Sequence, residues 1–532
     1  MTSADAAQTS RAAVADVPVD SECAKPSVAT GPASQPVPTL THKTVSGIAW
    51  MSLVQLGRQL LQLVSISILA RHIPPVAYGL VAMAALVTNF MEAMRDVGTG
   101  YALVREPHVS RELASTVFWL NCMVGGTATL LVVAASWPAA HFFHERLVAP
   151  ILQFLAISFF LGALSVVPTA MLNRAMEFRK VAMAQTCGAI SGAGVAIAMA
   201  VAGKGVWSLV AASISTASVT TLLVWAFAPV RIGFIFRRSE THNILHFGLN
   251  LTGFHILNYV SRNADNLFVG RFLGSAPLGY YQMGYMLMTY PINNFAAVVA
   301  QVVYPALATM RGDDERFRAA YLRTCRLIAL LTFPLMLGLA VTAHPFVRVF
   351  LGVKWMPVAA LLAVFGPLGA AQSIYTTTGL IYNTKGRTDV LFRWSMLASA
   401  TYLLSFVVGL RWGILGVASC YAAAWTLLMV PSFLIPFRLV GLSGTVFFRA
   451  LWPTLGYSLI MTAVAGGWQY VLARAGIEKA AVELSTTVAI GGGTYVALLL
   501  WRRPSVLEEV ASLLRGANHP VLRTLSRILP TQ

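Results

Sequence analysis

Charged residues are scarce in this chain. Of its 532 residues, 11% are Asp, Glu, Lys or Arg and 57% are hydrophobic. Because soluble domains carry about 25% charged residues, this composition excludes an ordinary soluble protein and predicts a polytopic membrane protein. Cysteine is scarce too: the five cysteines lie far apart, with no CxxC pair and no Cys/His cluster. We therefore expect no disulfide framework, no metal site and no cofactor.

Acidic residues and long loops are also lacking. The 20 Asp and Glu against 38 Lys and Arg give a formal charge of +18, but the basic residues are scattered singly through short loops, so nucleic-acid binding is excluded. No loop between the apolar runs exceeds about 20 residues, which leaves no place for a catalytic domain in water. We predict that the protein is not an enzyme.

Long hydrophobic runs take the place of charge. A helix needs about 20 apolar residues to cross a bilayer, and fourteen such runs are bounded by charged or turn residues. We predict an all-α polytopic membrane protein with about 14 transmembrane helices. The predicted spans are 46–70, 76–98, 113–136, 148–172, 181–203, 205–228, 247–270, 278–303, 323–343, 357–382, 390–410, 413–436, 449–472 and 482–501.

Basic residues fall unevenly on the two sides of these spans. With the N-terminus inside, 27 Lys and Arg residues lie on the cytoplasmic side and nine on the opposite side, as the positive-inside rule requires. We therefore expect both termini in the cytoplasm. Residues 1–44 are rich in Ala, Ser, Thr and Pro and have no apolar core of a signal peptide, which favours a disordered cytoplasmic tail.

Two halves of the chain share short motifs in the same order. ILARHIPPVAYGLVAM (68–83) matches FVGRFLGSAPLGYYQM (268–283) at an offset of 200 residues, with Arg71 aligned to Arg271 and Gly79 to Gly279. A duplication of six helices gives two pseudo-symmetric lobes around a cleft, the arrangement of an alternating-access transporter. The predicted parts are a tail (1–44), an N-terminal six-helix lobe (45–230), a cytoplasmic linker (231–246), a C-terminal six-helix lobe (247–440), two additional transmembrane helices (441–503) and a cytoplasmic tail (504–532).

Two arginines, Arg58 and Arg262, lie inside predicted spans. A charge at mid-bilayer costs roughly 2.5–3.5 kcal/mol, so it normally faces a cavity or a partner. Each arginine belongs to a polar stripe, and the stripes fall on corresponding helices. Because guanidinium matches phosphate oxygens, we predict an anion site. The alternative is that Arg58 reaches the interface or pairs elsewhere, and that Arg262 pairs with Asp265 or hydrogen-bonds locally. The candidate substrate-binding residues on the stripes are Gln55, Arg58, Gln62, His255, Asn258 and Arg262.

Four charged residues are candidates for coupling or gating. Asp265 lies deep in a span, where it is either the counter-ion of an arginine or a protonatable coupling group. Glu92, Arg95 and Asp96 are spaced i, i+3 and i+4 at the inner end of a helix, which favours either an interfacial ion-pair cluster or a gate.

The span 357–382 is unusually rich in hydroxyl groups. Gln372 and Tyr375 are candidates to bind sugar hydroxyls, although such side chains equally hold membrane helices together. The motif RGDDERFR (311–318) predicts a solvated cytoplasmic loop. Glycines with no following Walker lysine predict close helix packing: Gly188, Gly192, Gly194 and Gly491–Gly493.

The order of these features resembles the Wzx-type polysaccharide-biosynthesis exporters of the multidrug/oligosaccharidyl-lipid/polysaccharide exporter superfamily. The resemblance covers residues 42–500 and includes MRDVGTGYALVRE, FWLN, NRAMEFRK and NADNLFVGRFLGSAPLGYY. It implies a flippase that turns a polyprenyl-pyrophosphate-linked oligosaccharide across the bacterial inner membrane for exopolysaccharide, capsule or O-antigen synthesis. The expected partners are that lipid-linked glycan, membrane lipids, and a polysaccharide polymerase with its export machinery.

An ion-coupled multidrug antiporter of the same superfamily is the alternative. Cationic drugs need carboxylates within the membrane, whereas this chain has two arginines and only Asp265 deep in a span. A membrane glycosyltransferase or polymerase is disfavoured by the short loops and by the absence of paired carboxylates outside the spans.

Overall fold

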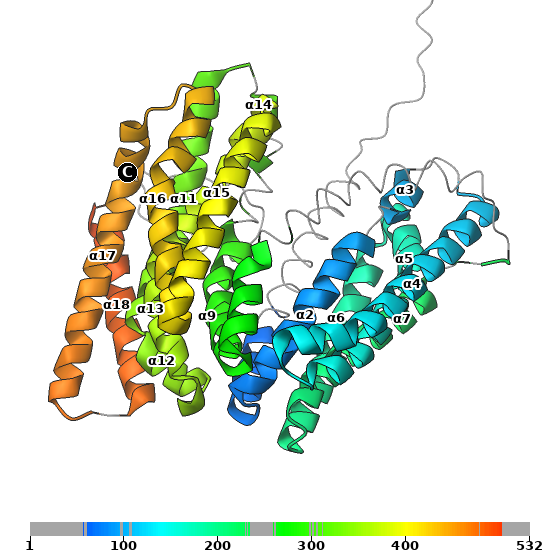
Figure 1. Ribbon diagram of the computed structural model, residues 1–532. Helices are drawn as coiled ribbons and strands as arrows, with labels where there is room; N and C mark the ends of the chain where they lie inside the picture. The colour runs from blue at the N-terminus through cyan, green and yellow to red at the C-terminus, as the bar shows by residue number, and fades with distance from the viewer. Residues whose placement is uncertain are drawn as a thin grey trace, which may run out of the picture. The chain divides into compact units, whose positions relative to one another are not determined.

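The computed structural model is made of helices, and no strand occurs in the part of the chain that it describes (Figure 1). Further helical segments cover residues 61–72 and 262–273. The helices are α2 (Pro75–Arg95), α3 (Thr99–Arg105), α4 (Arg111–Phe143), α5 (Val148–Arg174), α6 (Phe178–Val201), α7 (Val206–Phe227), α9 (Ser275–Pro291), η1 (Ile292–Ala296), α11 (Asp314–Val341), α12 (Ala343–Phe350), η2 (Val353–Trp355), α13 (Pro357–Tyr375), α14 (Thr378–Lys385), α15 (Thr388–Gly409), η3 (Leu410–Trp412), α16 (Gly413–Leu439), α17 (Gly444–Arg474) and α18 (Ala480–Arg502). The described residues are 57, 61–95, 99–105, 109–228, 230, 232–234, 259, 262–296, 299, 303–304, 307–310, 312–477 and 479–502.

Within those residues, nine segments are long and apolar enough to cross a membrane. Eight of them each overlap one predicted span, and the longest, Thr388–Leu439, contains both α15 and α16 and so covers the two predicted spans 390–410 and 413–436. The predicted all-α, multi-pass membrane protein is therefore confirmed. The total of fourteen spans stays a prediction, because parts of 46–70, 247–270 and 278–303 lie outside the described residues, and α17 is a helix that is not among the nine.

The helices pack in two groups. In the first, α4 packs on α5, α6 on α7, and α5 on α7. In the second, α13 contacts α9, α11 and α16, while α15 packs on α16. Helix α17 packs against both α11 and α18. Among the described helices, the most extensive contact between the two groups joins α2 to α9 (Figure 1).

The predicted span 357–382 is not one continuous helix, because α13 and α14 are separated at Thr376–Thr377. Both threonine hydroxyls donate to backbone carbonyls three residues earlier, at 2.8 Å from Thr376 and 2.7 Å from Thr377. Such side-chain bonds compete with the helical backbone bonds. The predicted span 278–303 is not one continuous α-helix either, because α9 ends at Pro291 and the π-helical turn η1 follows. Proline has no amide hydrogen to donate to the helical ladder.

Close packing at two predicted glycines is confirmed. A Cβ at Gly188 would lie 2.1 Å from the Thr220 hydroxyl, and a Cβ at Gly192 would lie 2.0 Å from the Thr216 hydroxyl. These glycines therefore allow α6 to approach α7. The prediction is wrong for Gly194 and for two glycines of α18, Gly492 and Gly493, where a Cβ would have nothing within 4 Å.

The matched glycines of the repeat lie where α2 crosses α9. A Cβ at Gly79 would lie 1.7 Å from the Ser275 carbonyl oxygen, and a Cβ at Gly279 would lie 2.1 Å from the Pro75 carbonyl oxygen. Residues 75 and 275 are themselves related by the offset of 200. Each half therefore makes the same contact with the other, as a two-fold axis requires. This reciprocity supports the predicted duplication.

The matched arginines flank this crossing. Arg71 donates to the Val349 carbonyl in α12 of the other half. Arg271 contacts His144, which directly follows α4. Two bonds add to these contacts: the Trp355 indole donates to the Ala70 carbonyl at 2.7 Å, and the Ser275 hydroxyl donates to Glu145 at 2.7 Å. We call this set, with the glycine crossing, the outer seam, since the predicted topology puts Arg71 and Arg271 on the outer side.

Candidate functional site

Several predicted site residues fall in parts of the chain that the structure does not describe. Glu92 is exposed near the C-terminal end of α2. Its gating role stays a prediction. The same holds for the candidates that lie outside the described residues: Gln55, Arg58, His255, Asn258, Asp96 and the side chain of Arg95.

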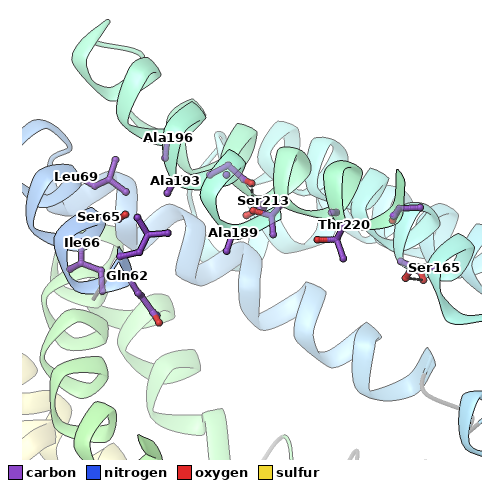
Figure 2. Close-up of a pocket in the computed structure, with 17 residues that line it drawn as sticks. Gln62, Ser65, Ile66, Leu69, Ser165, Ala189, Ala193, Ala196, Ser213 and Thr220 are labelled. Carbon is purple, nitrogen blue, oxygen red and sulfur yellow. Dashed lines mark hydrogen bonds between the residues drawn. The ribbon is translucent and has the colours of Figure 1, made fainter. Parts of the chain in front are cut away.

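A cavity of about 630 Å³ opens in the first half beside the helix at 61–72. The predicted Gln62 lines it, together with Ser65 one turn further along. Figure 2 shows these side chains along one wall, facing Ala189 and Ala193 of α6. The volume lies within the range of about 300–1,000 Å³ that is usual for small-molecule sites.

Small residues and hydroxyl groups make up most of the remaining wall. Alanines and glycines of α5, α6 and α7 leave the space, while Ser165, Ser213, Thr216, Thr220 and Thr221 contribute hydroxyls. None of the described residues around the cavity is charged. The arrangement therefore suits an uncharged group and does not by itself bind an anion.

Asp265 is buried, with 5% of its surface exposed. Its carboxylate accepts hydrogen bonds from the Tyr281 hydroxyl, at 3.0 Å, and from the Asn266 backbone amide, at 2.8 Å. The Asn266 side chain is equally buried, and its oxygen has no partner among the described residues. Sequence spacing did not predict the bond from Tyr281, because that residue lies on the next helix, α9.

The described contacts of Asp265 do not include Arg262. Arg262 is exposed, whereas Asp265 is turned toward Tyr281 of α9. Of the local alternatives to an anion site, the ion pair between Arg262 and Asp265 is therefore not formed between these two described residues. Ligand binding by Arg262 stays a prediction.

Gln372 and Tyr375 both have partners within the second half. The Gln372 amide donates to the Tyr421 hydroxyl at 2.9 Å. The Tyr375 ring packs edge-on against Trp425 and Phe433, with centroids 6.1 and 6.2 Å away. Substrate binding by Gln372 and Tyr375 stays a prediction, and in this structure both side chains hold helices together.

Hydroxyls beside them bridge α13 and its continuation to α11. Ser373 is hydrogen-bonded to Thr332 at 2.8 Å, and Thr377 to Tyr321 at 2.9 Å. All four side chains are buried. For these residues the described contacts match the alternative interpretation, in which hydroxyls join membrane helices.

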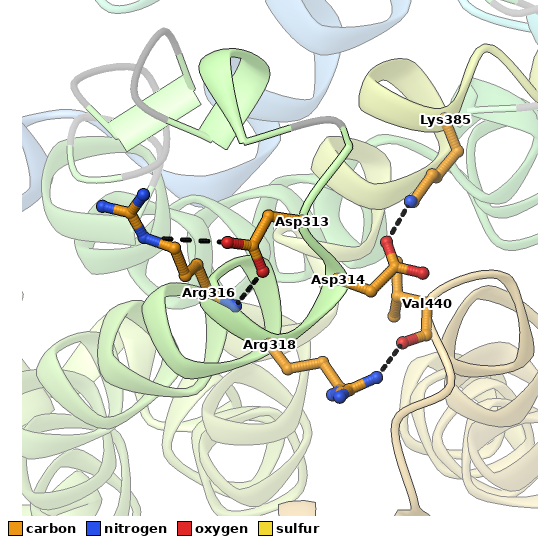
Figure 3. Close-up of polar contacts among 6 residues, drawn as sticks. All are labelled: Asp313, Asp314, Arg316, Arg318, Lys385 and Val440. Carbon is orange, nitrogen blue, oxygen red and sulfur yellow. Dashed lines mark hydrogen bonds and ion pairs between the residues drawn. The ribbon is translucent and has the colours of Figure 1, made fainter.

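The described part of the motif RGDDERFR, residues 312–318, contains the start of α11, so the predicted loop is wrong there, although residues 312–316 are exposed as predicted. Asp313 caps the start of α11, since its carboxylate accepts a hydrogen bond from the Arg316 backbone amide at 3.0 Å. Aspartate is favoured at this position because it satisfies an amide that has no partner within the helix. Asp314 forms an ion pair with Lys385 at the end of α14. Arg318 donates to the Val440 carbonyl at 3.0 Å, after α16 (Figure 3). Three helix ends are thereby joined in the second half.

Solved structures with a similar fold are membrane transporters. The "Lipid II flippase MurJ, inward closed conformation" matches with a TM-score of 0.69 and 14% identity, over 86% of this chain and 100% of that chain. An inward-facing multidrug resistance MATE family transporter of the MOP superfamily matches with a TM-score of 0.59 and 15% identity, over 72% of this chain and 94% of that chain. These similarities define the class of fold.

The chain belongs to the polysaccharide biosynthesis protein family, which it matches over residues 68–360. The "Teichuronic acid biosynthesis protein TuaB" of Bacillus subtilis (strain 168) is 25% identical over 89% of this chain and 99% of its own length. The "Lipopolysaccharide biosynthesis protein WzxC" of Escherichia coli (strain K12) is 25% identical over 70% of this chain and 76% of its own. The "Succinoglycan biosynthesis transport protein ExoT" of Rhizobium meliloti (strain 1021) is 25% identical over 90% of this chain and 97% of its own length. The predicted resemblance to Wzx-type exporters is confirmed.

Proposed function

We propose that the protein flips polyprenyl-pyrophosphate-linked oligosaccharide units from the cytoplasmic to the outer leaflet of a bacterial inner membrane. The units would feed exopolysaccharide, capsule or O-antigen synthesis, with both termini in the cytoplasm. The family match and the relatives named for teichuronic acid, lipopolysaccharide and succinoglycan biosynthesis support this class of substrate. The fold similarity to a flippase supports transport as the activity.

The outer seam is the observation that carries the proposed mechanism. The two halves touch through reciprocal contacts at Gly79 and Gly279 and through Arg71 and Arg271 on either side. A transporter that alternates between two states needs an interface that closes on one side of the membrane and separates in the other state. The seam is the proposed interface of this kind, and its small set of hydrogen bonds around one helix crossing supports that role.

Arg262 is the described residue best suited to hold the pyrophosphate. Its guanidinium is exposed and does not pair with the carboxylate three residues away. A planar guanidinium can give two parallel hydrogen bonds to phosphate oxygens. With Arg58 on the corresponding helix, it forms the proposed anion site, while the prenyl chain stays in lipid.

Asp265 is the proposed coupling group. A carboxylate buried in the membrane is expensive unless it binds a proton or a cation, and beside it the side-chain oxygen of Asn266 has no partner among the described residues. The same buried carboxylate favours the alternative, an ion-coupled multidrug antiporter. Ion-driven drug efflux by purified protein in vesicles would support that alternative, whereas transfer of a lipid-linked glycan would exclude it as the main activity.

Export in a deletion strain tests the proposal. Complementation with Arg262→Ala, alone or with Arg58→Ala, should stop polysaccharide export, and the lipid-linked intermediate should accumulate on the cytoplasmic side. Arg262→Lys, which keeps the charge but loses the planar fork, should retain part of the activity. The matched control is Arg411→Ala, an exposed arginine in η3 that lies outside the proposed site.

The outcome is decisive when the variants reach the membrane at the level of the unmodified protein. Full export by the Arg58→Ala, Arg262→Ala double variant would overturn the anion site. Normal export in the deletion strain itself, with no accumulated intermediate, would overturn the proposed function.

A further inference from the structure

The cavity of the first half has features that the transport proposal has not used. It is about 630 Å³ in volume, is lined from four helices, and has no charge among its described lining residues. We propose that this cavity is a subsite for uncharged sugar residues of the transported glycan. The inference rests on the proposed function and adds where the sugars are held.

Ser65 points to a polar ligand. It is 8% exposed, lines the cavity, and its hydroxyl has no hydrogen-bond partner among the described residues. Hydroxyls buried in membrane helices normally find a partner. A lipid chain in the cavity would leave this hydroxyl unsatisfied, whereas a sugar hydroxyl would satisfy it.

The other hydroxyls offer acceptors to the same ligand. Ser213, Thr216 and Thr221 donate their hydrogens to backbone carbonyls of Leu209, Ala212 and Leu161, at 3.2, 2.8 and 3.0 Å. Their oxygen lone pairs remain, so they can accept from a ligand that carries many donors. Sugars have this property, and the amide of Gln62 adds a group that can donate and accept.

A second cavity shows what an apolar site looks like in the same protein. It measures about 400 Å³ and is lined by residues such as Leu86, Phe90 and Phe142. Its two polar side chains already have partners: the Tyr259 hydroxyl donates to the Leu86 carbonyl at 2.9 Å, and the Asn263 amide donates to the Tyr259 carbonyl at 2.9 Å. The contrast sets the first cavity apart as a place for hydroxyl-rich ligands.

The position along the chain agrees with a sugar next to a phosphate. Gln62 and Ser65 follow Arg58 at spacings of four and seven residues, on the same predicted polar stripe. In a lipid-linked glycan the first sugar is bonded directly to the pyrophosphate. A phosphate held at Arg58 would therefore present its sugars to Gln62 and Ser65, which follow it on the predicted stripe.

Filling the cavity tests the inference. Ala189 and Ala193 lie one turn apart on α6 and face the space (Figure 2), so Ala189→Leu with Ala193→Leu places two larger side chains in it. Ala198→Leu, on the exposed side of the same helix, is the matched control. Ser65→Ala is a milder variant that keeps the packing and removes only the unpaired hydroxyl.

Two probes are measured on the purified full-length protein in nanodiscs. One is the labelled oligosaccharide released by mild acid from the lipid-linked intermediate of the deletion strain, and the other is polyprenyl pyrophosphate without sugar. The filled variant should bind the oligosaccharide at least about tenfold more weakly, and Ser65→Ala about three- to tenfold more weakly. Both should bind polyprenyl pyrophosphate within about twofold of the unmodified protein, as should Ala198→Leu with either probe.

Three results would overturn the subsite. They are unchanged oligosaccharide binding in the filled variant, loss of polyprenyl pyrophosphate binding instead (a lipid-chain site), and equal loss of both probes (a general defect). Failure of the proposed function is a different result, since the unmodified protein would then bind neither probe and would not restore export.

Discussion

Alanine at position 79 should push α2 and α9 apart at the outer seam. Its Cβ would lie 1.7 Å from the Ser275 carbonyl oxygen and 2.5 Å from the carbonyl carbon. Contacts below 3.0 Å essentially never occur for real Cβ atoms, so the two helices must separate by at least about 1.3 Å, the difference between 3.0 and 1.7 Å. Both obstructing atoms belong to the backbone and cannot rotate away.

The expected penalty falls on the state in which the seam is closed. Overpacking of this kind costs typically about 1–3 kcal/mol, and the higher helix propensity of alanine acts equally on both states. Since about 1.4 kcal/mol changes an equilibrium tenfold, the ratio of open to closed seam should rise roughly five- to 150-fold. The proposed opening of the seam during transport makes this shift measurable without unfolding.

Alkylation of a single cysteine measures the opening. Ser275→Cys, in a background without the five native cysteines, places a thiol at a position that is 7% exposed. Adding Gly79→Ala should raise the rate of reaction with a membrane-impermeant maleimide at least about fivefold. Gly194→Ala, where a Cβ has nothing within 4 Å, is the control and should leave the rate unchanged. An unchanged rate with Gly79→Ala, at normal expression, would refute the close crossing.

The second glycine gives a stricter test of the same geometry. Gly279→Ala should act in the same direction, since its Cβ would lie 2.1 Å from the Pro75 carbonyl oxygen. Both obstructions belong to one crossing, so the separation forced by one alanine also relieves the other. The double variant should therefore resemble the stronger single variant, and a fully additive effect would contradict a single crossing.

Four further predictions concern contacts within and between the helices. Tyr281→Phe should lower thermal stability by about 1–3 kcal/mol because it leaves the Asp265 carboxylate short of a donor. Asp265→Asn should keep the fold and lose ion-driven export; export at the normal level would contradict the proposed coupling role of Asp265. Gly192→Ala should destabilise by about 1–3 kcal/mol by meeting Thr216 at 2.0 Å, and a melting temperature equal to that of Gly194→Ala would contradict this packing. Lys385→Met should cost at most about 1 kcal/mol, since its ion-pair partner is 47% exposed; a larger loss in thermal unfolding would show that the pair is better shielded than its exposure indicates.

Membrane spans were predictable because one property determines them. A run of about 20 apolar residues must be helical in a bilayer, and the ends of α5 and α16 fall within three residues of the predicted limits. Breaks within spans were not predictable from apolarity, as Thr376–Thr377 shows. There the competing side-chain hydrogen bonds are local, and the hydroxyl-rich run was the available signal.

The candidate site was likewise predictable from the sequence only in part. Helical spacing placed Gln62 on a polar stripe, and it lines a cavity. It could not show that Asp265 would bond to Tyr281, because that contact depends on how the following helix packs. Contacts between helices need a register that no single-helix pattern contains.

Duplication adds the missing information for one part of the molecule. The offset of 200 residues identifies equivalent positions but does not say which of them touch. Near a two-fold axis, however, each residue lies close to the equivalents of its own neighbours. A position that keeps glycine in both copies, one turn after the start of the helix in each, is therefore a candidate for the axis. Gly79 and Gly279 meet that condition, and each meets the equivalent of residue 75 or 275 across the crossing. The matched glycines were thus the signal in the sequence for the outer seam, and the matched arginines mark its edges.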